Sequence, residues 1–226
     1  MIELLVVIAI LAGLAAILLP VLGRAKMKAQ AIQCENHLKQ FGLAWALYSA
    51  GYGEWVPPNN AYGASNTWVR GWLELYKDPS LNPDNTNTLH LAASLLSPYF
   101  GAALGIWRCP TDKSGLARSV SMNAWLNCQQ TPDGYAGLPN VFRVIRRTGD
   151  MTTPSPTQTY VFTEERSDST NDGYFSVFMG WAGPQAFLLN YPASYHNGGG
   201  TWPLLMAIPR AGSGVLRGRH PRCSPT

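Results

Sequence analysis

Oxygen-bearing side chains are concentrated in the stretch EERSDSTNDG, residues 164–173. Ca²⁺ binds carboxylate and amide oxygens, and a glycine lets the chain turn tightly around the ion. Glu164, Asp168, Asn171 and Asp172 are therefore candidate ligands of a structural calcium ion. Their spacing does not match an EF-hand loop. Asn-Asp and Asp-Gly pairs also form ordinary turns, so a plain surface turn is the alternative interpretation.

The four cysteines lie at positions 34, 109, 128 and 223, without the paired CxxC spacing of a zinc site. In an oxidising compartment, a disulfide between Cys109 and Cys128 would close a modest loop, and we take this pair as the candidate bond. Two alternatives stay open. Cys34 bonds to Cys109 and joins an N-terminal helix to the rest of the chain, or Cys34 is simply a small buried residue of that helix.

Sequence patterns typical of enzymes are missing. The chain contains no GxSxG, HExxH, P-loop or dinucleotide-binding motif, and its four histidines are scattered singly. We therefore expect no enzyme, no catalytic residue and no cofactor beyond the candidate calcium ion.

The first 22 residues form an apolar stretch that carries one charge, on Glu3. At about 1.5 Å per residue, a helix of this length crosses a bilayer core of roughly 30 Å. The sequence therefore predicts a transmembrane helix over residues 1–22. Its large apolar side chains are Ile2, Leu4, Leu5, Val6, Val7, Ile8, Ile10, Leu11, Leu14, Ile17, Leu18 and Leu19.

The helix is expected to continue over residues 23–52 as an amphipathic helix, because apolar residues recur every three or four positions. Gly51 and Gly53 supply its stop signal. The apolar face comprises Ala31, Cys34, Leu38, Phe41, Trp45, Tyr48 and Tyr52.

Glu3 and Pro20 are the two unusual residues of the apolar stretch. A carboxylate at the lipid-buried end of a helix is costly unless it meets a cation, so Glu3 requires a partner. The alternative is an acid that reaches the membrane surface by itself. Pro20 removes one backbone hydrogen bond and is expected to kink the helix, either at the membrane exit or in a role in assembly.

The segment Ile2–Ile10 with Glu3 near its start, then Pro20 and then Arg24-Ala25-Lys26, resembles the type IV pilin and type II secretion pseudopilin superfamily. Similar proteins begin with a basic leader ending in Gly, which is cut before a Phe whose new amine is methylated. This chain opens Met-Ile-Glu, which we attribute to a misplaced start or a truncated reading frame.

The resemblance implies a structural subunit that partners with copies of itself, with other pilin-like subunits and with an inner-membrane assembly platform. Glu3 would then neutralise the terminal amine of a neighbouring subunit in a filament. The implied location is the inner membrane, single-pass, with the head in the periplasm, and a periplasmic or extracellular filament after assembly. Arg24, Lys26 and Lys28 alone would favour the opposite topology by the positive-inside rule, but a missing leader would carry the deciding charges.

Residues 53–202 are expected to form one α+β head, because about 150 residues suffice for a single core. Charged residues make up only 13% of the chain, which contains 22 Gly and 17 Pro, as in a loop-rich exported domain. We expect a short helix over 89–96 capped by Thr88, and a strand into a turn at GIWRCPTDKS. Further strands are expected in ARSVSMNAWLNC, QTYVFTEE and GYFSVFMG, packed as an antiparallel sheet against the helix.

The motifs Cys109-Pro110-Thr111-Asp112, Ser121-Met122-Asn123 and 171–175 resemble large-headed prepilin-type proteins of Planctomycetes-like and Verrucomicrobia-like bacteria. Such proteins carry a His, then nine intervening residues, and then Asp-Gly. His196 matches the histidine, but Met206-Ala207 stand where Asp-Gly belongs.

Residues 203–226 are free of acids and rich in Arg, Pro and Gly. A shift of reading frame near residues 200–202 would explain this basic tail; the alternative is a genuine divergent tail. Four of the 17 basic residues lie there, so the other 13 balance the 13 acids and leave no basic face for nucleic acid on the head.

Three functions fit these features. The first is the filament subunit. The second is a membrane-anchored binding or adhesion module, whose aromatic-rich head recognises glycans or a surface through Trp68, Trp72, Trp107, Trp125 and Trp181. The third is a monomeric single-pass protein. Exposed, coplanar aromatic side chains would favour binding, whereas burial against the helix would favour scaffolding.

Overall fold

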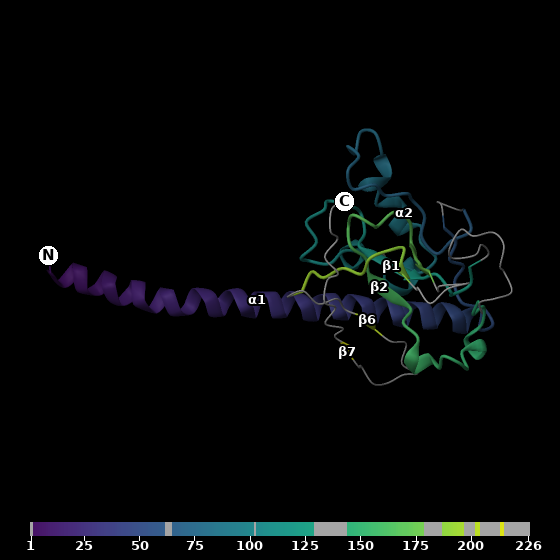
Figure 1. Ribbon diagram of the computed structural model, residues 1–226, viewed down its shortest axis with the longest axis horizontal. Helices are drawn as coiled ribbons and strands as arrows, with labels where there is room; N and C mark the ends of the chain where they lie inside the picture. Colours follow the sequence, from purple (N-terminus) through teal and green to yellow (C-terminus); the bar gives the residue numbers. More distant parts are fainter. Residues whose placement is uncertain are drawn as a thin grey trace.

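The computed structural model describes residues 2–61, 65–101, 103–128, 144–178, 187–196, 202–203 and 213–214. Its longest element is α1, Ile2–Gly51, which continues through Pro20. Figure 1 shows α1 entering a small head, formed by the described residues after Gly51, at one end and carrying the N-terminus far from it at the other. The predicted long helix is thus confirmed, with both ends within one residue of those expected.

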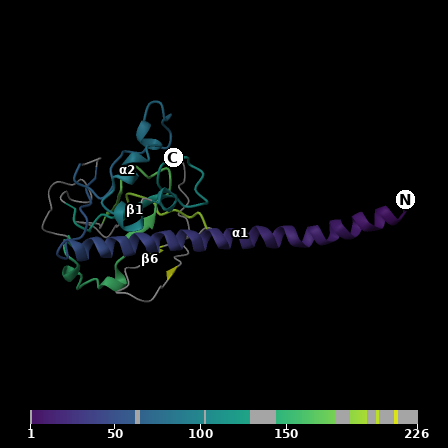
Figure 2. The same cartoon turned by 180° about the vertical axis from the view of Figure 1, so that it is seen from behind.

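The two halves of α1 have opposite surroundings. Every residue from 2 to 29 is exposed, whereas the C-terminal half lies along the head (Figure 2). The predicted apolar face is buried except at its ends: Ala31 is half-buried, and Tyr52, 58% exposed, stacks on Tyr48 beyond the last helical turn. The buried residues of α1 are Cys34, Leu38, Phe41, Ala44, Trp45, Tyr48 and Ser49.

A three-stranded sheet in the order β2-β1-β3 forms the centre of the head, with β1 at Val120–Asn123, β2 at Phe162–Glu164 and β3 at Tyr174–Phe175. β1 pairs with β2 in antiparallel fashion and with β3 in parallel. The α+β class is confirmed, but the expectation of an antiparallel sheet is wrong. The chain between β2 and β3 does not form a hairpin; it passes from one edge of β1 to the other, so β3 runs in the direction of β1.

The remaining regular elements are short. β4 pairs with β5 and β6 pairs with β7, both antiparallel. Five 3₁₀ turns lie within the loops of the described part of the head. The bounds are β4 Val177–Phe178, β5 Phe187–Leu188, β6 Trp202–Pro203, β7 Ser213–Gly214, α2 Leu89–Ala92, and the turns η1 Pro83–Asn85, η2 Ser97–Phe100, η3 Leu104–Trp107, η4 Thr148–Asp150 and η5 Pro156–Gln158.

Two local predictions are wrong. The helix expected over 89–96 ends at Ala92, and the Asn87 side chain, not that of Thr88, accepts a hydrogen bond from the amide of its first residue, Leu89. Within the expected span, Leu91 and Leu96 are buried, whereas Leu89 is 74% exposed, because the chain turns after one helical turn. The strand expected at GIWRCPTDKS is instead the 3₁₀ turn η3 followed by a tight turn.

Phe41 lies at the centre of the hydrophobic core. Its ring makes edge contacts with Trp68, Phe100 and Trp107 and a tilted contact with Phe162. Trp68 and Trp107 are fully buried and stacked, with ring centroids 5.5 Å apart. Aromatic residues from early and late parts of the head's sequence therefore pack around Phe41. This packing fixes the positions of the loops that carry them.

Candidate functional site

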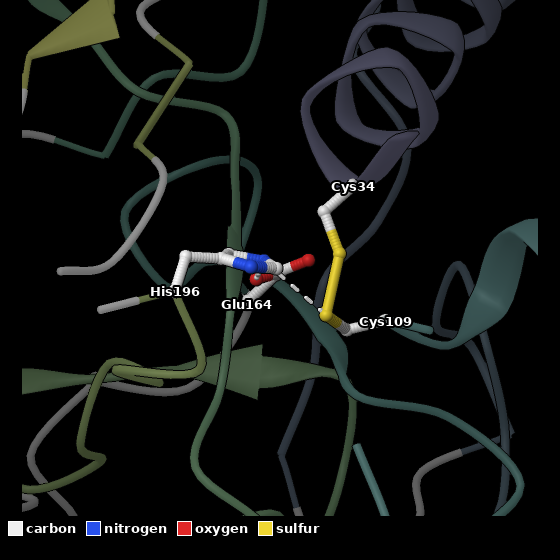
Figure 3. Close-up of side chains that lie close together, drawn as sticks. All are labelled: Cys34, Cys109, Glu164 and His196. Atoms are coloured by element: carbon white, nitrogen blue, oxygen red, sulfur yellow. Dashed lines mark hydrogen bonds and ion pairs between the residues drawn. A yellow bond between two sulfur atoms is a disulfide. The ribbon is translucent and has the colours of Figure 1, made fainter. Parts of the chain in front are cut away.

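Four side chains that carry metal-binding or redox chemistry meet where α1 enters the head. Sγ of Cys34 and Cys109, one carboxylate oxygen of Glu164 and one ring nitrogen of His196 all lie within 4.8 Å of one another. In Figure 3 the imidazole and the carboxylate face the two sulfur atoms. The four residues come from four different segments, so only the folded head brings them together.

Cys34 and Cys109 form a disulfide with Cα atoms 5.4 Å apart and a sequence separation of 75. This Cα separation is in the usual range for disulfides. Cys34 lies on the buried face of α1, and the amide of Cys109 is held by a 2.9 Å hydrogen bond to the Ser119 hydroxyl. The bond therefore links α1 covalently to the segment that leads into β1.

Glu164, the last residue of β2, is 2% exposed. Its backbone carbonyl accepts a hydrogen bond from the amide of Ala193, which aligns the segment carrying His196 beside β2. Oε2 of Glu164 lies 3.5 Å from Nε2 of His196 and has no hydrogen-bond partner among the described residues. A buried carboxylate oxygen without a donor is unusual, because it has lost its hydration without replacement.

His196 completes the cluster. Its side chain is 9% exposed, and Nε2 lies 3.4 Å from Sγ of Cys109. The neighbouring Tyr195 hydroxyl accepts a hydrogen bond from the amide of Ser167, which holds the segment against the loop after β2. The other ring nitrogen of His196, Nδ1, has no hydrogen-bond partner among the described residues.

His37 lies one turn after Cys34 on α1, beyond the apolar segment. Burial lowers its pKa, an effect opposed by a hydrogen bond to the backbone of Arg108 and by the nearby Glu164 carboxylate. His37 therefore borders the cluster and contacts the residue that precedes Cys109.

The four clustered groups have two chemical capabilities. In this structure the two sulfurs form a disulfide that links α1 covalently to the head. As thiolates, together with the imidazole and the carboxylate, they are ligands that transition metals bind.

The predicted Cys109–Cys128 disulfide is wrong, because Cys109 is bonded to Cys34, one of the alternatives left open by the sequence. Cys128 is a free, buried thiol whose pKa is raised to about 11, chiefly by burial. The physical reason is the packing of α1 on the head, which brings position 34 to Cys109. The sequence did mark three of these residues: Cys34 lies on an apolar helix face, and Cys109 and His196 lie in motifs that resemble those of prepilin-type proteins. Nothing in the sequence indicates that these positions meet.

The four candidate calcium ligands do not converge. Glu164 faces the cysteines, and Asp168 accepts a hydrogen bond from Arg166. Asn171 accepts a hydrogen bond from the amide of Asp172, and Asp172 accepts one from the amide of Tyr174. Within the described part of the chain, the one group of His, Cys and carboxylate side chains close enough to hold a metal contains only Glu164 of the four.

The residues predicted to act in assembly lie on the exposed half of α1. Glu3 is in its first turn and Pro20 within it, and the predicted transmembrane side chains are all exposed, between 50% and 78%. By length and composition, α1 is a helix able to cross a membrane. No structural partner of Glu3 is among the described residues, and its role stays a prediction.

The tryptophans named as binding candidates divide between core and periphery. Trp68 and Trp107 are fully buried against α1, and Trp72 and Trp125 are half-buried. Trp181 lies outside the described residues. The buried pair supplies scaffolding and not an exposed aromatic platform.

In comparisons with known proteins, no family model, curated protein or solved structure matches this chain.

Proposed function

We propose that this protein is a pilin-like structural subunit of a type II secretion pseudopilus or a type IV pilus-like filament. The observation that carries the proposal is the division of the unbroken helix α1, whose residues 2 to 29 are exposed while its later turns are buried against the head. An apolar surface of this size is stable in lipid or in the centre of a helical bundle, but not in water. In a subunit that moves from the membrane into a filament, the same segment lies first in lipid and then among neighbouring helices. An apolar segment is stable in both places.

Glu3 gives this proposal its assembly chemistry. The carboxylate lies in the first turn of α1, where the helix N-terminus favours negative charge, and is followed by apolar residues only up to residue 23. In a bundle of parallel helices the carboxylate would neutralise the terminal amine of a neighbour and so fix the axial register. Before assembly the subunit would reside in the inner membrane with its head in the periplasm.

The test is Glu3→Ala, with Glu35→Ala as the matched control. Glu35 is an acid on the same helix, partly exposed and paired with Lys39 at its surface. We expect Glu3→Ala to insert into the membrane at wild-type levels but to lose most of its incorporation into sheared filaments, whereas Glu35→Ala assembles normally. Membrane fractionation and quantitative blotting of the filament fraction measure both quantities. Equal incorporation of Glu3→Ala and wild type would instead identify α1 as a simple anchor.

The binding-module alternative lacks an exposed aromatic platform among its four described candidate tryptophans, since Trp68 and Trp107 are in the core and Trp72 and Trp125 are half-buried. We therefore propose the filament subunit alone.

A further inference from the structure

The cluster of Cys34, Cys109, Glu164 and His196 contains more chemistry than a disulfide uses. A disulfide is neutral and needs neither a carboxylate nor an imidazole beside it. Yet Glu164 is 2% exposed, and its Oε2 has no hydrogen-bond donor among the described residues. Such burial is costly unless a positive charge compensates it, and His196, 3.5 Å away, supplies one only while its imidazole is protonated. A cation bound among these groups would supply that charge.

The arrangement fits tetrahedral coordination. With Zn–S bonds of about 2.3 Å and Zn–N or Zn–O bonds of about 2.0–2.2 Å, adjacent ligand atoms lie about 3.3–3.8 Å apart. Here Nε2 of His196 lies 3.4 Å from Sγ of Cys109 and 3.5 Å from Oε2 of Glu164. Both distances that involve His196 thus already have the required spacing, and all four ligand atoms lie within 4.8 Å of one another. Cys34, once its sulfur is released from Cys109, is the fourth.

The donor set selects the class of ion. Thiolate sulfur and imidazole nitrogen favour zinc and similar transition metals, whereas Ca²⁺ and Mg²⁺ require oxygen ligands. Two thiolates and one carboxylate also provide three negative charges, against two positive charges on the ion.

We propose that, when the Cys34–Cys109 disulfide is reduced, Cys34, Cys109, Glu164 and His196 bind one zinc-class divalent ion. Reduction by a dithiol consumes two electrons and two protons: the S–S bond breaks, two thiols form and the dithiol is oxidised to a disulfide. Binding of the ion then releases the two thiol protons to solvent. The oxidised and the metal-bound forms both tie α1 to the head, one by a covalent bond and the other by coordination.

This site does not depend on filament assembly. It lies in the buried half of α1 and in the head, whereas the assembly surface is residues 2 to 29, so either proposal can fail while the other stands.

The full-length protein in detergent, reduced with a phosphine and freed of the reductant without air, is titrated with Co²⁺ and then with Zn²⁺. We expect one Co²⁺ per chain, with the intense visible bands of a tetrahedral site and sulfur-to-cobalt charge transfer, and displacement by Zn²⁺. The oxidised protein is expected to give neither signal, because its sulfurs are bonded to each other.

Variants identify the ligands. We expect Cys34→Ser, which leaves Cys109 as the one thiolate, to weaken the charge-transfer bands, and His196→Ala and Glu164→Gln each to weaken Zn²⁺ binding by more than about 10-fold. Cys128→Ser and Asp168→Asn are the matched controls, since Cys128 is a buried thiol and Asp168 an acid outside the cluster, and both should bind as wild type does. Tryptophan fluorescence of each oxidised variant verifies the fold, because Trp68 and Trp107 are buried in the core.

Two results would overturn the proposal. One is a reduced, folded wild type that takes up no Co²⁺. The other is uptake that is unchanged in both His196→Ala and Glu164→Gln, which would place the ion elsewhere.

Discussion

Glu164 and Glu165 are adjacent acids with different surroundings, because successive residues of a strand point to opposite sides. Glu164 faces the cysteines, whereas Glu165 is fully buried on the other side and accepts hydrogen bonds from Ser121, Ser169 and Asn190. Burial raises the pKa of Glu165 to about 8, although the hydrogen bonds from Ser121 and Asn190 and the charge of Arg118 oppose the shift.

The raised pKa of Glu165 predicts a specific pH dependence of stability. Between its ordinary value of 4.5 and about 8, the folded protein keeps a proton on Glu165 that the unfolded chain has lost. The free energy of unfolding should therefore fall as pH rises through this window, on the order of a few kcal/mol from this group. In Glu165→Gln the same fall should be smaller. Urea unfolding at pH 5 and pH 8 for both proteins measures the difference, and identical pH slopes would contradict the assignment.

Arg118 is the buried cation on that side of the sheet, and its guanidinium donates hydrogen bonds to the backbone carbonyls of Gly71, Asn171 and Asp172. The chain beside these carbonyls leaves room only for glycine at 173, where a Cβ would lie 2.5 Å from Cγ1 of Val69 and 2.8 Å from Nε1 of Trp68. The Asn-Asp-Gly turn thus serves packing around a buried cation.

At the level of elements, α1 is held in the head by one face of side chains centred on Phe41. Four aromatic rings contact Phe41, and the opposite face of the same turns is open, with Leu43 54% exposed. The hydrophobic core of the head therefore includes residues of α1, and the head without α1 would lose the centre of that core.

Phe41→Ala should remove the centre of this core. We expect a loss of about 3–5 kcal/mol in the free energy of unfolding, because the surrounding rings cannot close the cavity fully. Leu43→Ala, on the open face, should change stability by less than about 0.5 kcal/mol. Denaturant unfolding in detergent, followed by the fluorescence of buried Trp68 and Trp107, compares the two. A similar effect of both substitutions would mean that α1 is not packed as described.

For the molecule as a whole, the Cys34–Cys109 bond connects the start of the buried half of α1 with the middle of the head. It closes a loop of 75 residues, and cross-links over loops of this length typically add about 2–4 kcal/mol by restricting the unfolded chain. The head and the helix are thereby kept together even if their packing opens transiently.

Reduction should therefore lower the stability of the metal-free protein. With a chelator present, we expect the reduced wild type to unfold at lower denaturant concentration than the oxidised form, by an amount equivalent to about 2–4 kcal/mol. Cys34→Ala should show no response to the reductant. Cys128→Ala should respond as the wild type does, because Cys128 is unpaired. A reductant effect that persists in Cys34→Ala would assign it to another bond.

Features that depend on neighbours along the chain could be predicted from the sequence. The apolar run of residues 1–22 and the three-to-four-residue period that follows predicted α1 almost to its ends, because helix formation and its buried face repeat with the local geometry. The residues of β1, β2 and β3 were likewise located, although the strands are shorter than expected.

Which distant residues meet depends on how the whole chain folds. The direction of β3 depends on the path of the loop after Glu165, and the partner of Cys109 depends on which turn of α1 lies beneath it. Successive members of the cluster Cys34, Cys109, Glu164 and His196 are 32 to 75 positions apart, so no local pattern relates them. Their meeting results from the packing of loops around Phe41, which is a property of the complete core.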